Sequence, residues 1–249
     1  MNKVDKKVNA AILIIGNEIL SGRTQDVNVI FLSRWLNGEG VKVEEVRIIP
    51  DIENIIVKNI NELRKKFNYV FTTGGIGPTH DDITSQSVAK AFNVGYGYNK
   101  KAYKILKNYY KVGEFNVGRK KMAKMPENSQ LILNPTSGAP GFIIENVFCL
   151  PGVPSILQSM INNLKNKISG GKKILSKTIN LRTVESEIAT SLAMVQKDCL
   201  DVEIGSYPFF KGGKIGVAIV LRSTDNKKMV LSFKKIISFV KAKKIKLIK

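Results

Sequence analysis

The 249-residue sequence carries 40 basic and 20 acidic residues, a formal net charge of +20, and 43% hydrophobic residues. No class other than soluble globular fits this composition, and the length suits one or two domains. The longest apolar runs, such as Ala10–Ile15, are far shorter than the roughly 20 residues that span a bilayer, so no membrane partner is expected. Lysines are spread along the chain without interleaved aromatics, so nucleic acid is not the expected partner.

The two cysteines, Cys149 and Cys199, and the single histidine, His80, stand apart in the sequence. A structural zinc site is therefore not expected. Two lone cysteines suggest a reducing compartment, and we expect a cytoplasmic protein.

The first half of the chain alternates apolar runs with helical periodicity. The N-terminal run follows basic residues but has strand length, and Gly16-Asn17-Glu18 replaces a small-residue cleavage site, so a strand is expected rather than a signal peptide. Strands alternating with helices predict a parallel sheet with right-handed crossovers. The predicted elements are strand Asn9–Ile15, helix Val27–Trp35, strand Val41–Ile49, helix Ile52–Leu63, strand Tyr69–Thr73 and helix Ile83–Phe92.

The second half is less regular up to Ser169-Gly170-Gly171, which predicts a boundary between domains 1–169 and 172–249. Residues 113–124 are basic and show no clear period. Before the boundary we expect helix Lys100–Tyr110, strands Leu131–Leu133, Phe142–Ile144 and Val147–Leu150, and helix Ile156–Leu164. After it we expect strand Ile174–Leu181, helix Glu185–Val195, strands Asp201–Ser206 and Lys214–Leu221, and helix Lys227–Val240, a small α+β domain.

The segment Thr72–Thr84, TTGGIGPTHDDIT, carries the strongest chemical signal. Its glycines follow a buried strand and precede a helix, where backbone N–H groups and the helix dipole bind anions. Asp81 and Asp82 would repel a bare phosphate, whereas a divalent cation such as Mg²⁺ between carboxylate and phosphate oxygens reverses that repulsion. Alternatively, one of these aspartates only caps the following helix.

Three further positions are candidates on the same sheet edge. Asp51 follows the second strand, although it could also be a helix cap. Glu18 follows the first strand and is harder to explain as a cap. His80 has the titration range for acid–base catalysis, but a lone loop histidine is more often merely exposed. The Gly/Pro turns at 134–142 and 151–154 offer amides and hydroxyls for a ligand, or are ordinary tight turns.

These motifs, in this order, resemble the CinA family. The matching segments are GNEILSG at 16–22, Asn28, Asp51, TTGGIGPTHDDIT at 72–84, APGF at 139–142 and LPGVP at 150–154. The N-terminal domain of that family belongs to the MoaB/Mog molybdopterin-binding superfamily, and the THDD form is similar to a domain of eukaryotic FAD synthases. The resemblance implies a three-layer, mostly parallel α/β fold followed by a small α+β, KH-like domain, and a homo-oligomer.

The resemblance also implies chemistry on a metal-bound phosphoanhydride. Its CinA branch is associated with metal-dependent hydrolysis of ADP-ribose, the FAD synthase domain with FAD hydrolysis, and the Mog branch with Mg-dependent adenylyl transfer to molybdopterin. Two departures bear on the ligand: the family's NPVGTAPGF reads NPTSGAPGF, and Ile156 replaces an acidic residue. The 249 residues contain no counterpart of the C-terminal deamidase domain, and no deamidase activity is expected of them.

The leading hypothesis is a Mg²⁺-dependent nucleotide pyrophosphatase that releases AMP from ADP-ribose, FAD or a related dinucleotide. The alternatives are a molybdopterin-binding or adenylyl-transfer protein and a non-catalytic nucleotide-binding module. The predicted catalytic residues are Asp82, Asp51 and Glu18, with Asp82, Asp81 and Asp51 as metal ligands. The predicted phosphate and ligand contacts are Thr73, Gly74, Gly75, Gly77, Pro78, Thr79, Asn28, Ser137, Gly138, Pro151 and Gly152.

Overall fold

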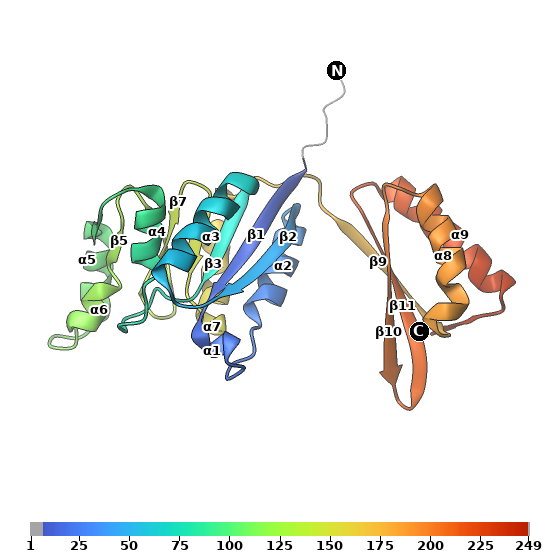
Figure 1. Ribbon diagram of the computed structural model, residues 1–249, viewed down its shortest axis with the longest axis horizontal. Helices are drawn as coiled ribbons and strands as arrows, with labels where there is room; N and C mark the ends of the chain where they lie inside the picture. Colours follow the sequence, from blue (N-terminus) through green and yellow to red (C-terminus); the bar gives the residue numbers. More distant parts are fainter. Residues whose placement is uncertain (1–6, 249) are drawn as a thin grey trace, which may run out of the picture. The chain divides into compact units, whose positions relative to one another are not determined.

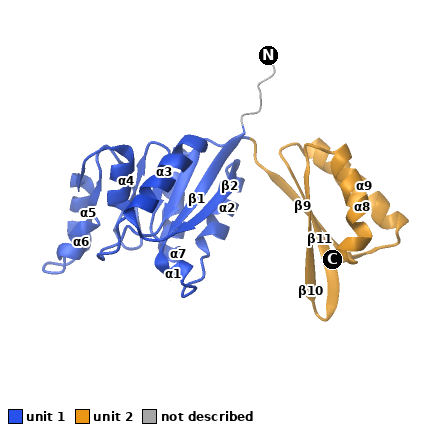
Figure 2. Cartoon of the chain, in the orientation of Figure 1, with its two compact units in different colours: residues 1–171 blue, residues 172–249 orange. Residues whose placement is uncertain are grey.

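The structure, a computed structural model, describes residues 7–248. The chain consists of two compact units, Met1–Gly171 and Lys172–Lys249 (Figure 2). The basic residues at 3 and 6, which entered the signal-peptide argument, lie outside the described residues. Within residues 7–248 no helix has both the length and the apolar character needed to cross a membrane.

Unit 1 is built around one six-stranded sheet (Figure 1). Its strands are β1 (Val8–Ile15), β2 (Val41–Ile49), β3 (Tyr69–Thr73), β6 (Gln130–Ile132), β7 (Gly141–Ile144) and β8 (Val147–Leu150). The order across the sheet is β2-β1-β3-β8-β7-β6. The first four strands in that order pair in parallel, and β7 pairs antiparallel with β8 and with β6. The sheet is therefore mostly parallel, with an antiparallel end where a short hairpin joins β7 to β8.

Helices cover both faces of this sheet and give the three layers that the sequence predicts. One face packs against α3 (Glu53–Lys66), α4 (Thr84–Phe92) and α5 (Lys100–Tyr109), and the other against α2 (Asn28–Gly38), α7 (Pro154–Met160) and the 3-10 helix η1 (Ile161–Lys167). In β1, Leu13 and its alternate neighbours enter the first core, and Ile12 and its neighbours enter the second. A strand buried on both faces needs apolar residues at every position, which explains the unbroken run in the sequence.

Four short elements of unit 1 do not follow from sequence periodicity. They are α1 (Asn17–Leu20), α6 (Val117–Lys121), β4 (Tyr96–Tyr98) and β5 (Lys124–Pro126). The basic stretch around α6 shows no hydrophobic period because a single helical turn has too few residues to display one. What starts this helix is local: the Asn116 side chain accepts a hydrogen bond from Arg119 N at 3.0 Å, as a helix cap does.

Unit 2 has the order strand, helix, strand, strand, helix, strand. Its elements are β9 (Leu175–Arg182), α8 (Glu185–Asp198), β10 (Glu203–Lys211), β11 (Lys214–Ser223), α9 (Asn226–Ala242) and β12 (Lys246–Ile248). The strands form an antiparallel sheet in the order β10-β11-β9-β12, and its core packs against α8 and α9. The predicted strand 201–206 is too short, because β10 continues through Pro208; an edge strand tolerates a residue without an N–H.

The strand directions in unit 1 bring distant loops to one edge of the sheet. Parallel strands β1, β2, β3 and β8 all end there, so the loops that follow them meet. Because β6 runs antiparallel to β7, and β7 antiparallel to β8, the end of β6 reaches the same edge. The turn at 134–142 thus lies on the edge where the sequence placed it.

Candidate functional site

The candidate site is built where the ends of adjacent strands are joined by backbone hydrogen bonds. Gly74 N, just beyond β3, donates to Leu150 O at the end of β8 at 3.1 Å. Gly16 N, just beyond β1, donates to Ile49 O at the end of β2 at 3.1 Å. These bonds continue the parallel pairing past the strands, and they fix the starting points of four loops relative to one another.

Gly74 and Gly75 are required by backbone conformation and by space. Their φ angles are +96° and +67°, in the left-handed region that favours glycine. A Cβ on Gly74 would lie 2.2 Å from Ile15 O, and a Cβ on Gly75 would lie 2.1 Å from Thr84 Oγ1. The predicted phosphate-binding turn therefore has glycines at the two positions where a side chain would collide with Ile15 O, at the end of β1, or with Thr84, at the start of α4. The buried Thr84 hydroxyl has no hydrogen-bond partner among the described residues.

Asp82 closes the turn on itself instead of capping α4. Its Oδ2 accepts hydrogen bonds from Thr79 N at 2.7 Å and from Thr79 Oγ1 at 2.5 Å. The N-cap residue of α4 is Ile83, without a side-chain cap bond, and Thr84 N donates to Gly75 O at 2.9 Å. The interpretation of either aspartate as the cap of this helix is therefore wrong.

Asp81 is fully exposed beside the same turn. The pKa of its carboxyl is lowered, chiefly by the nearby Thr79 side chain and by its own backbone N–H, and less by His80 and Lys121. The Thr79 hydroxyl thus lies close to both carboxylates. His80 is exposed, as expected of a lone loop histidine.

Asp51 is likewise not a helix cap. The N-cap residue of α3 is Ile52, and Asp51 Oδ2 instead accepts a hydrogen bond from Asn17 N at 2.8 Å, which ties the β2 loop to the β1 loop. The pKa of Asp51 is raised, first by partial burial and then by the charges of Glu18, Asp81 and Asp82, while the Asn17 N–H acts in the opposite direction. Asp51 therefore experiences the other three predicted acidic residues as near neighbours.

The donor set suits a hard divalent cation. Carboxylate oxygens are the ligands that Mg²⁺ prefers, and it is bound through one or two carboxylates together with substrate phosphates. Among residues 7–248, no group of three or more His, Cys, Asp or Glu side chains is gathered closely enough to hold a metal ion alone. The described side chains therefore do not form a complete metal site by themselves, and a cation held jointly with a phosphate ligand stays a prediction.

The remaining predicted contacts shape the neighbouring loops. Asn28, 3% exposed at the start of α2, donates from Nδ2 to Gly152 O at 2.7 Å, and its Oδ1 has no partner among the described residues. A Cβ on Gly152 would lie 3.4 Å from Gly74 Cα, so Gly152 packs against the glycine turn. The hydrogen bond from Asn28 to Gly152 O therefore helps to hold that turn in place. Of the other predicted contacts, Thr73 is buried at the end of β3 and Pro151 is half-buried.

The turn at 134–142 is organised by one buried side chain. Asn134 Oδ1 accepts from Thr136 N and Ser137 N at 3.0 Å each, and its Nδ2 donates to Ser137 Oγ and Ala139 O. Gly138, with φ +73°, lies under the ring of Tyr109. Ser137 remains half-buried, so of these two predicted contacts it is the better placed to meet a ligand.

Two participants were missed by sequence reasoning. Asn17 contributes only its backbone N–H, which no residue type signals. Lys121, on α6, donates from Nζ to Thr79 O and so contacts the glycine turn from 42 residues away in sequence. Only its place in an unpatterned basic stretch could have drawn attention to it.

Comparison with known protein families shows which family unit 1 matches. Residues 11–169 match the family described as a probable molybdopterin binding domain. The chain belongs to this family. Residues 173–248, in unit 2, match the middle domain of FAD synthase. The first match agrees with the resemblance drawn from the sequence motifs. The second adds unit 2 to the similarity with FAD synthases, which the THDD motif had indicated for unit 1.

Individual relatives confirm the CinA-like character. A protein of Archaeoglobus fulgidus is 34% identical over 228 residues, covering 91% of this chain and 97% of its own length. A CinA-like protein of a Sulfurihydrogenibium species is 38% identical over 161 residues, covering 61% of this chain and 40% of its own length. The crystal structure of a CinA protein of unknown function from Thermoplasma acidophilum is 30% identical, with a TM-score of 0.61, over 65% of this chain and 98% of that one. The predicted CinA-like family and the three-layer, mostly parallel α/β fold are therefore confirmed.

Proposed function

We propose that the chain is a divalent-metal-dependent nucleotide pyrophosphatase, which hydrolyses ADP-ribose, FAD or a related dinucleotide to AMP and a phosphate ester. The observation that carries the proposal is the placement of Asp51, bonded to Asn17 N, and Asp82, bonded to Thr79 N, on the sheet edge that holds a glycine turn whose backbone admits no side chain. The raised pKa of Asp51, due first to burial and then to Glu18, Asp81 and Asp82, agrees with this placement. Four acidic groups from three loops repel one another in the free protein. A cation held jointly with a phosphoanhydride turns this repulsion into attraction.

Each residue has a distinct task in this proposal. The backbone N–H groups of Gly75 and Gly77 face an anhydride oxygen without a Cβ in the way. Asp82, with Asp51 or Asp81, would hold the cation, and Glu18 would orient the attacking water or another polar group. When bound, the divalent cation would neutralise negative charge on the anhydride oxygens. In the proposed hydrolysis, water adds to one phosphorus of the anhydride and the bridging oxygen leaves with the other phosphorus. This releases AMP.

The proposal is tested by incubating the purified protein with ADP-ribose or FAD and Mg²⁺, and measuring AMP by chromatography. Parallel reactions contain K⁺ or Co²⁺. The expected result is metal-dependent AMP formation that is lost on addition of EDTA and in Asp82→Asn. If no AMP forms from either substrate under any of these conditions, the proposal is wrong.

A second candidate function follows from the family match to a probable molybdopterin binding domain. In this case the same edge would hold a pterin phosphate, with or without adenylyl transfer. Pterin fluorescence that copurifies with the protein, and is lost in Asp82→Asn, supports this candidate. The match of residues 173–248 to an FAD synthase domain favours testing FAD first.

A further inference from the structure

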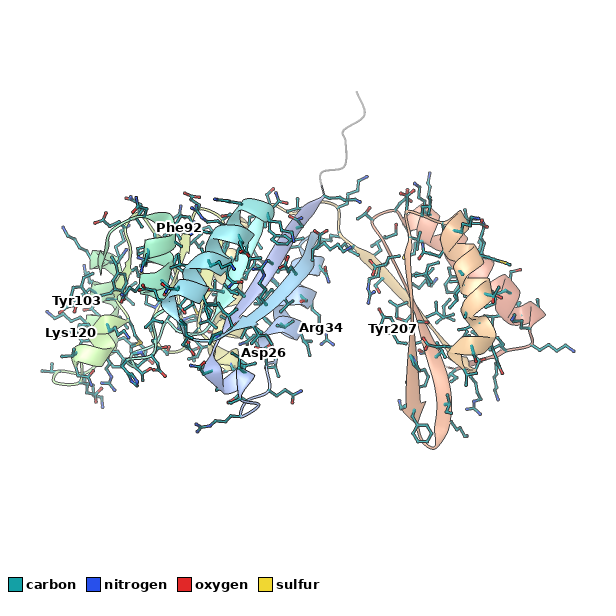
Figure 3. All side chains as sticks on the ribbon, in the orientation of Figure 1. Asp26, Arg34, Phe92, Tyr103, Lys120 and Tyr207 are labelled. Atoms are coloured by element: carbon teal, nitrogen blue, oxygen red, sulfur yellow. The ribbon has the colours of Figure 1, made fainter. Side chains whose placement is uncertain are left out.

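Helix α6 packs directly against the glycine turn. A Cβ on Gly118 would lie 3.2 Å from Pro78 O, so the helix and the turn are in backbone contact. One turn later along the helix, Lys121 Nζ donates a hydrogen bond to Thr79 O. In Figure 3 the label of Lys120 marks this helix on the left of the molecule. The basic helix α6, which lies outside all of the predicted motifs, is therefore part of the site.

The three basic residues of α6 are directed differently. Arg119 stacks over the ring of Tyr110, with Cζ 4.1 Å from the centroid, and donates to Glu114 O at 2.5 Å. Lys120 Nζ lies 5.8 Å from the centroid of Phe115. Lys121 alone of the three is hydrogen-bonded to the turn. The aromatic contacts of its neighbours and the Asn116 cap hold α6 in place, so Lys121 is presented by a fixed element.

The Lys121 ammonium has capacity for a ligand. It carries three N–H donors, and Thr79 O takes one of them. The turn itself presents the carboxylates of Asp81 and Asp82, so any phosphate that enters needs compensating positive charge beyond that of one cation. A fixed ammonium beside the turn supplies that charge without a change of fold.

We propose that Lys121 binds a phosphate oxygen of the nucleotide ligand at the Gly74–Asp82 turn. This inference rests on the ligand class of the proposed function, but not on hydrolysis. It assigns a cationic role in ligand binding to Lys121 of the basic helix, beside the turn that carries Asp81 and Asp82. It predicts that charge at position 121, rather than only the hydrogen bond to Thr79 O, sets the affinity for phosphate.

The experiment measures the affinity for AMP in the presence of Mg²⁺ by isothermal titration calorimetry, in which no hydrolysis occurs. Four proteins are compared: wild type, Lys121→Gln, Lys121→Arg and Lys120→Gln. Lys121→Gln keeps a donor for Thr79 O but removes the charge, Lys121→Arg keeps the charge, and Lys120→Gln removes an equal charge from the adjacent position. Thermal melting of all four proteins checks that each is folded.

We expect Lys121→Gln to weaken AMP binding at least about tenfold, as loss of a charged hydrogen bond does. Lys121→Arg and Lys120→Gln should stay within about threefold of the wild type. Equal affinity of Lys121→Gln and wild type, or an equal loss in Lys120→Gln, overturns the inference, as does an absence of AMP binding by the wild type. Charge-dependent binding of AMP without any hydrolysis of ADP-ribose or FAD refutes the proposed function alone.

Discussion

In unit 1 helices cover both faces of a mostly parallel sheet, whereas in unit 2 α8 and α9 pack against an antiparallel sheet. Parallel strands end at one edge, so the loops that carry residues 18, 51 and 82 lie on the same edge although they are far apart in sequence. Antiparallel strands end alternately at opposite edges, and unit 2 carries none of the predicted site residues. The comparison teaches that strand direction, more than composition, decides where distant loops collect.

The largest expected effect is that of Asp82→Asn, with Asp225→Asn as its comparison. Both aspartates accept hydrogen bonds from backbone N–H groups. Asp82 does so in the glycine turn, and Asp225 does so as the N-cap of α9 in unit 2. Asp82→Asn should lower AMP formation about 10²–10³-fold, because it removes a ligand of the proposed cation. Asp225→Asn should leave AMP formation unchanged. Initial rates at saturating substrate measure both, and equal losses would place the chemistry outside unit 1.

A second pair compares two glycines with positive φ. Gly74→Ala should destabilise unit 1 by about 3 kcal/mol or more, since the new Cβ meets Ile15 O and φ is +96°. Gly212→Ala, at φ +58° with open space around it, should cost about 1 kcal/mol. Urea unfolding followed by the fluorescence of Trp35, the single tryptophan, measures unit 1, and circular dichroism of the same samples follows both units. A shift of this transition in Gly212→Ala but not in Gly74→Ala would contradict the comparison.

The pH dependence tests the acidic edge. Because the folded pKa of Asp51 lies above its ordinary value of 3.8, its ionised form weakens the fold at pH 7, and this cost disappears as the pH falls through the folded pKa towards 3.8. Asp51→Asn should therefore raise the melting temperature by a few degrees at pH 7 and by less at pH 4. Calorimetric scans at both pH values measure this. A stabilisation that grows as the pH falls would refute the raised pKa of Asp51.

The smallest effect concerns the two cysteines, one in each unit. Cys149 is fully buried in β8, and burial raises the pKa of its thiol to about 12. Cys199, at the end of α8, is only partly buried. In the native protein at pH 8 a thiol reagent should modify Cys199 within minutes, while Cys149 should react only when unit 1 unfolds. Mass spectrometry of timed samples locates the label, and early modification of Cys149 would show that the core of unit 1 opens.

Much of the fold could be predicted because its signals are local. The limits of β2 and β3 match their apolar patterns residue for residue, since each strand is bounded by glycine or by a helix start. The elements α6, β4 and β5 could not be predicted, because they lack the apolar runs that mark the equally short strands β3, β7 and β8. The strand that became β10 was predicted to end at Ser206, whereas it continues through Pro208 to Lys211. The position of β10 at the edge of the sheet, which allows the proline, is a tertiary property.

The candidate site, like the fold, was predicted where its signals are local and missed where they depend on tertiary packing. Asp82 and Asp51 could be identified as residue types at strand ends, but their hydrogen-bond partners could not. Asp51 was open to interpretation as a cap until its bond to Asn17 N was known, and that partner is a backbone group from another loop. Lys121 depends on the packing of Gly118 against Pro78, which no spacing in the sequence encodes.

The bonds from Thr79 to Asp82 also bear on selectivity. In the free protein the N–H and hydroxyl of Thr79 are already occupied by a carboxylate of the same turn. An incoming anion must compete with this tethered group, whose effective concentration is at least on the order of millimolar. Inorganic phosphate gains little from the exchange, whereas a metal-bound phosphate offers the displaced carboxylate a new partner. If the proposed function holds, the turn would select ligands by the cation that accompanies them and would disfavour free anions.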